Sequence, residues 1–74
     1  MTQTITIELK DDFITLAQAL KYANVIGSGG QAKWFLQEYA VYLNGELEDR
    51  RGKKIYRGDQ LLIPVEELTI LIAK

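Results

Sequence analysis

The first ten residues alternate between apolar and polar side chains. Ile5, Ile7 and Leu9 fall on one side of an extended chain, and the residues between them are polar. A period of two with β-branched residues is typical of a strand that buries one face. The pattern predicts a strand over residues 2–9.

A first helix is predicted after this strand. Four apolar residues follow the i, i+3, i+4, i+7 spacing of an amphipathic helix: Leu16, Ala19, Leu20 and Ala23. Thr15, with Gln18 three residues later, has the capping-box pattern that begins a helix. Gly27 predicts the end, because glycine readily adopts the left-handed conformation in which many helices stop.

A second helix is predicted from the capping-box pattern of Ser28 and Gln31 through about Tyr39. Its apolar face comprises Ala32, Phe35, Leu36 and Tyr39. At 100° per residue the opposite side comprises Lys33, Trp34 and Gln37. Two short helices joined by a glycine-rich turn predict a compact αα unit.

The second half of the chain predicts short strands. Asn44 and Gly45 accept the positive φ angles of a tight turn, and apolar residues flank them, so residues 41–48 predict a hairpin. Further strands are expected at 54–56 and 60–63, joined by a turn at 57–59. Pro64 places the end of the second of these at a sheet edge or a crossover.

Residues 68–73 predict a last strand beside the first. The expected fold class is α+β. Two short packed helices lie against a small, mostly antiparallel sheet, in a single domain over residues 1–74.

The composition argues against catalysis. The chain of 74 residues has no Cys, which excludes a thiolate nucleophile and a Cys-based zinc site, and no His, which is the commonest general base and metal ligand. We therefore expect no catalytic residue, metal, cofactor or small-molecule substrate. Glu8 interrupts the N-terminal segment where a signal peptide needs an apolar run, and no apolar stretch is long enough to span a membrane. The expected location is the cytoplasm.

Charge is distributed unevenly along the chain. Residues 31–57 carry six basic and four acidic side chains, a balance of +2, while the rest carries three and six, a balance of −3. Five of the bases form one run without an acid: Arg50, Arg51, Lys53, Lys54 and Arg57. A basic patch on an acidic body orients an anionic partner. The alternative is a solvated loop that happens to be basic.

Two features near the second helix are candidates for ligand contact. Gly29 and Gly30 leave backbone N–H groups uncovered at a helix start, which attracts phosphate, although a turn needs no ligand. Trp34 points away from the apolar stripe beside Lys33, as a platform on which an unpaired base can stack. The alternative is that Trp34 packs under the basic run or the last strand.

Three motifs recur together in a known family. They are SGGQAKWFL from Ser28 to Leu36, VYLNG from Val41 to Gly45, and GDQLLI from Gly58 to Ile63. Over residues 13–64 this combination resembles the S4 RNA-binding domain, also called the alpha-L RNA-binding motif. The run RRGKK from Arg50 to Lys54 makes it most similar to the stand-alone bacterial YaaA-type and YbcJ-type members.

The resemblance implies a non-catalytic protein that binds structured RNA, such as ribosomal or transfer RNA. It implies an RNA-facing surface on the second helix, the hairpin and the loop: Lys33, Trp34, Gln37, Arg50, Arg51, Lys53, Lys54 and Arg57. Many family members carry an Arg directly after the Ser that opens the second helix, where this chain has Gly29. The charge is instead concentrated in residues 50–54.

Two other classes remain open. The VxxNGE hairpin and the late Gly-Asp turn also resemble β-grasp sulfur-carrier proteins, but those end in Gly-Gly and this chain ends Leu71-Ile72-Ala73-Lys74. The second alternative is a protein-interaction module that docks on a ribosome-associated partner. We expect a monomer, with RNA and a possible ribosomal or RNA-processing protein as partners and without membrane contact.

Overall fold

The computed structural model describes residues 3–74. The elements in chain order are β1 (Gln3–Ile7), β2 (Phe13–Thr15), α1 (Leu16–Tyr22), α2 (Gln31–Glu38), β3 (Tyr42–Leu43), β4 (Glu46–Leu47), β5 (Lys54–Tyr56), β6 (Gln60–Ile63), the 3-10 turn η1 (Pro64–Glu66) and β7 (Leu68–Ile72). A five-stranded sheet has the order β1-β7-β6-β3-β4, and β2 pairs with β5 in a second sheet. Among the strand pairs of residues 3–74, β1–β7 alone is parallel. The predicted α+β class is confirmed.

The first and last strands lie side by side, as predicted. Ile5 pairs with Ile70 and Ile7 with Ile72. Ile7, Ile70 and Ile72 are buried because the alternation of each strand turns them to the inner face. The predicted strand over 2–9 is shortened to 3–7, with Thr2 outside the described residues.

The start of α1 is predicted correctly and its end is not. Thr15 Oγ1 accepts from the Gln18 N–H at 3.2 Å, and Gln18 Oε1 accepts from the Thr15 N–H at 2.8 Å. The helix ends at Tyr22 rather than near Gly27. Asn24, at φ 60°, takes the left-handed position, and the Val25 N–H donates to Leu20 O at 2.9 Å. These contacts form a Schellman stop, which asparagine can make in place of glycine.

The predicted capping box of α2 is half formed. Gln31 Oε1 accepts from the N–H groups of Gly27 and Ser28, but the N-cap is Gly30 and the helix start has no side-chain cap. At the other end the helix stops at Glu38. Tyr39 is the extended C-cap residue and is 45% exposed, so it lies just past the helix. Its ring still contacts that of Phe35, with 5.1 Å between the ring centres.

The hairpin forms as predicted, with φ angles of 51° at Asn44 and 87° at Gly45. The edge position suggested by Pro64 is wrong, because β6 lies between β3 and β7. Pro64 instead begins η1, where its lack of an N–H group breaks no hydrogen bond between strands.

The sequence did not predict β2, which has only three residues and pairs with β5 about forty positions later.

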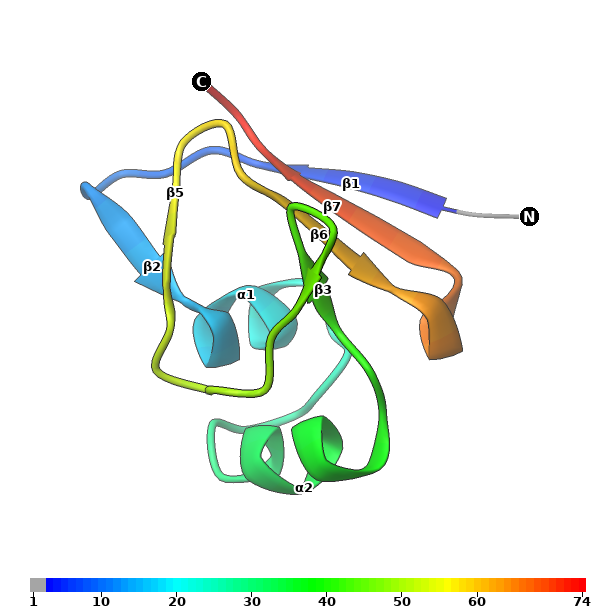
Figure 1. Cartoon of the computed structure of the whole chain (residues 1–74). Helices are drawn as coiled ribbons and strands as arrows, with labels where there is room; N and C mark the ends of the chain where they lie inside the picture. The colour runs from blue at the N-terminus through cyan, green and yellow to red at the C-terminus, as the bar shows by residue number, and fades with distance from the viewer. Residues whose placement is uncertain (1–2) are drawn as a thin grey trace.

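Both helices lie on the same side of the five-stranded sheet (Figure 1). Leu16, Ala19 and Leu20 of α1 are fully buried against the inner residues of the sheet. Ala32 and Leu36 attach α2 to the same core. The opposite face of α2 is therefore left open beside the loop that precedes β5.

Candidate nucleic-acid interface

The backbone of residues 50–54, here called the basic loop, is fixed to the start of α1. The Ala17 N–H donates to Arg51 O at 3.0 Å, and the Leu16 N–H donates to Lys53 O at 2.8 Å. These carbonyls satisfy two of the N–H groups that a helix start leaves without intrahelical partners. Lys54 continues into the β2–β5 ladder opposite Thr15. The loop is thus a rigid platform from which basic side chains project.

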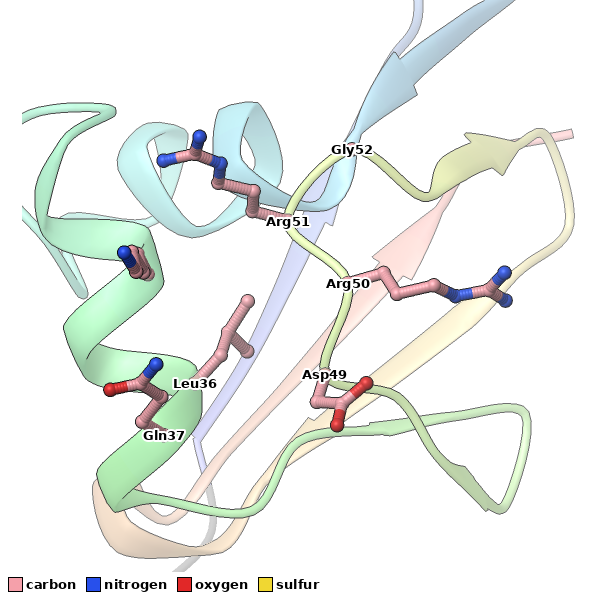
Figure 2. Close-up of a pocket in the computed structure, with 7 residues that line it drawn as sticks. Leu36, Gln37, Asp49, Arg50, Arg51 and Gly52 are labelled. Atoms are coloured by element: carbon pink, nitrogen blue, oxygen red, sulfur yellow. The ribbon is translucent and has the colours of Figure 1, made fainter.

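An open hollow of about 650 Å³ separates α2 from the basic loop (Figure 2). Its lining is Lys33, Leu36, Gln37, Asp49, Arg50, Arg51 and Gly52. Cations thus come from both walls, Lys33 from the helix and Arg51 from the loop. The structure brings together four of the residues that the resemblance assigned to RNA. Leu36, which forms part of the floor, was predicted only as a core residue.

The two neighbouring arginines have different environments. Arg50 Nε lies 2.9 Å from Glu48 Oε2 and its Nη2 lies 3.3 Å from Glu48 Oε1. This hydrogen bonding lowers the pKa of Glu48 and raises the pKa of Arg50. In Figure 2 the Arg50 side chain extends away from α2, whereas Arg51 extends to the side on which the helices lie. Sequence reasoning missed Glu48, although its i, i+2 spacing to Arg50 was a visible signal.

The lysines of the basic loop line a second hollow. This space of about 450 Å³ is bounded by Arg50, Gly52, Lys53, Lys54 and Tyr56. Lys54 Nζ lies 4.9 Å from the centre of the Phe13 ring, a cation–π contact that holds the ammonium group over β2. The two hollows share Arg50 and Gly52, so the cations form one surface along the loop.

Trp34 is 65% exposed. It lines a hollow of about 550 Å³ together with Val25, Ile26, Phe35 and Tyr39. Within the described part of the chain, neither the basic loop nor β7 contributes to this lining, so the alternative of burial under those segments is wrong. Lys33 Nζ lies 5.8 Å from the Trp34 ring. Since Lys33 also lines the hollow beside the basic loop, it connects the aromatic surface to the cationic one.

Three of the candidate residues lie apart from this surface. Arg57 follows β5 at the end opposite the basic loop, about 10 Å away for a three-residue strand, and its Nη2 donates to Leu9 O at 3.2 Å. Gly29 and Gly30 are exposed at the start of α2 and do not line either cationic hollow. A Cβ built on Gly29 meets nothing within 4 Å.

Two features of residues 3–74 bear on other functions. No group of three or more Asp, Glu, His or Cys side chains in this range is placed to hold a metal ion. None of the helices described is long and apolar enough to cross a membrane.

The family comparison agrees with the geometry. The model of the S4 domain family matches residues 7–71, which include both helices and the basic loop. The chain belongs to the S4 domain family. A curated relative is the "Probable ribosome maturation protein RlbA" of Bacillus subtilis (strain 168), which is 55% identical over 53 residues, or 72% of this chain and 75% of the relative. Family membership and the presence of α2 disfavour the β-grasp alternative.

Proposed function

We propose that this S4 domain protein is a non-catalytic RNA-binding protein that contacts structured RNA in ribosome maturation. The observation that carries the proposal is the hollow with Lys33 on one wall and Arg51 on the other. Membership of the S4 family and the printed name of the relative support the ribosomal setting.

Phosphate contacts supply most of the proposed affinity. Arg51 offers a planar fork for two phosphate oxygens, while Lys33, Lys53 and Lys54 act as point charges. Gly52 has no side chain, and a Cβ there would meet nothing within 4 Å, so a sugar–phosphate chain can approach its backbone closely. About five contacts of this kind give micromolar binding at physiological salt.

The exposed face of α2 supplies recognition of shape. Gln37 provides a neutral hydrogen-bonding group beside the cations, which suits the 2′-hydroxyls and phosphates of the wide minor groove of an RNA helix. Trp34 provides a stacking surface for a base that leaves the helix, at about 1–3 kcal/mol per stacked base. Ribosomal RNA offers paired and unpaired segments side by side, and transfer RNA does so on a smaller scale.

The test is a titration of Trp34 fluorescence with ribosomal and transfer RNA at several salt concentrations. The double variant Lys33→Glu/Arg51→Glu is compared with Lys10→Glu/Lys74→Glu, which changes the net charge equally but lies outside the hollow. We expect at least tenfold weaker binding for the first variant and a salt slope that falls by about two. Binding that both variants weaken equally would reject the hollow as the RNA site.

A further inference from the structure

The five-stranded sheet has an outer face that the helices do not cover (Figure 1). The pairing of the strands places five residues in one row across this face: Leu47, Tyr42, Leu62, Thr69 and Thr4. A second row adds Gln60, Leu71 and Thr6. We call these eight residues the outer face. None of them is charged.

The outer face exposes three leucines and a tyrosine among its threonines and glutamine. An antiparallel sheet with one buried side commonly places polar residues on the other. Here Leu47 is 64% exposed, Leu62 39% and Leu71 38%, whereas Leu61 and Ile70 on the inner side are fully buried. A small hollow of about 230 Å³ lies among Tyr42, Gly45, Gln60 and Leu62. It is wide enough to receive an aliphatic side chain from another molecule.

The charges around the outer face disfavour RNA. Glu66 and Glu67 lie in the connection between β6 and β7, at one end of the outer face. Glu46 pairs with Leu43, which pairs with the buried Leu61, so Glu46 belongs to the row that faces the helices. The cations of the basic loop and α2 lie on the helix side of the sheet, and Lys74 follows β7 at the end opposite Glu66. A phosphate backbone would meet no cation within the outer face and acidic groups at its border.

The size of the outer face also disfavours a second copy of this chain. The five strands are two to five residues long, and a spacing of about 4.8 Å between strands with about 3.3 Å per residue gives a footprint of about 300 Å². Stable complexes bury about 800 Å² per partner. A larger partner that extends past the outer face to Glu66 and Glu67 fits the charges and the area better.

We infer that the outer face is a docking surface for a basic protein that inserts an aliphatic side chain into the hollow beside Leu62 and pairs with the acidic border. The apolar residues supply the buried contacts, and Glu66 in the connection between β6 and β7 orients the partner. Because the outer face and the basic loop lie on opposite sides of the sheet, the protein can hold RNA and this partner together.

The test uses the protein fraction of ribosomes from which the RNA has been removed. Ribosomal proteins are chosen as the source of basic proteins, and this choice rests on the proposed function. Position 62 is replaced by a photo-crosslinking phenylalanine derivative, with the same replacement at Lys21 on α1 as the control. The expected result is one basic protein, identified by mass, that crosslinks from position 62 and not from position 21. Crosslinks between copies of the chain, or no crosslink, would overturn the inference.

The identified protein is then purified and titrated with three forms of the chain. Leu62→Thr/Leu71→Thr keeps strand propensity and neutrality while removing the apolar contacts, and should weaken binding at least tenfold. Glu66→Lys should weaken it severalfold, whereas Lys33→Glu/Arg51→Glu should leave it unchanged. Equal binding by all three forms would refute the docking surface. RNA titration of the same variants reports separately on the proposed function, and normal RNA binding by the Leu→Thr variant shows that it is folded.

Discussion

The side chain of Asn44 is hydrogen-bonded to that of Asp59 across two separate turns. Asn44 Nδ2 donates to Asp59 Oδ1 at 3.1 Å, and Asn44 Oδ1 accepts from the Gln60 N–H at 2.9 Å. Asp59 Oδ2 accepts in turn from the Tyr56 N–H at 2.8 Å. The Asn-Gly and Gly-Asp motifs of the family therefore join the hairpin turn to the β5–β6 turn. Their role here is to hold the fold.

Replacement of Asp59 by alanine should lower stability without changing the RNA surface. The side chain accepts two hydrogen bonds at a partly exposed position, so we expect a loss of about 1–2 kcal/mol in the free energy of unfolding. For a domain of this size each kcal/mol lowers the melting temperature by about 4–8 °C. Thermal unfolding followed by circular dichroism measures the change, and Gln37→Ala on the exposed side of α2 is the control. If the Asp59→Ala protein has unchanged stability but no longer binds RNA, Asp59 contributes to RNA binding and not to the stability of the fold.

The two adjacent arginines should contribute unequally to RNA binding. Arg50 is already hydrogen-bonded to Glu48, so a phosphate must compete with a carboxylate for it, whereas Arg51 projects to the helix side of the loop. We expect Arg51→Ala to weaken RNA binding about fivefold, with a salt slope lower by about one, and Arg50→Ala to weaken it less than twofold. Filter binding at several salt concentrations measures both. Equal losses would mean that Arg50 leaves Glu48 when RNA binds.

The Glu48–Arg50 pair should make stability depend on pH. The hydrogen bonds from Arg50 hold the pKa of the folded carboxyl below that of an unfolded Glu, about 4.3. Between the folded and the unfolded pKa of Glu48, the unfolded state therefore binds more protons than the folded state. The stabilisation by the Glu48–Arg50 pair is fully present above about pH 4.3 and is lost as the pH falls through the folded pKa. Denaturant unfolding should show Glu48→Gln less stable than the natural chain at pH 7, with a difference that shrinks at pH 3. If the difference in stability is the same at pH 7 and at pH 3, Glu48 stabilises the fold through packing and not through its charge.

Local patterns account for much of the fold and for only part of the candidate site. The alternation around Ile7 and Ile70 and the capping box at Thr15 are short-range signals, and the structure confirms both. The pairing of β2 with β5 joins distant segments of three residues each, which no periodicity reveals. The charge run likewise marked the basic loop but not that Glu48 engages one of its arginines. Side-chain partners depend on how the loop folds back, and composition does not determine that.

Replacement of Gly29 by arginine should strengthen RNA binding. The resemblance places an Arg at this position in many S4 members, and a Cβ atom at Gly29 would meet nothing within 4 Å. Gly29 is exposed beside the start of α2 and has no positive φ angle that would disfavour another residue. We expect severalfold tighter binding and a salt slope higher by about one, because one phosphate contact is added. Gly29→Ala is the matched control for the loss of glycine and should leave affinity unchanged. If Gly29→Arg binds no more tightly than Gly29→Ala, the RNA does not pass the start of α2, and the contact surface is confined to the basic loop and the wall of α2 that carries Lys33.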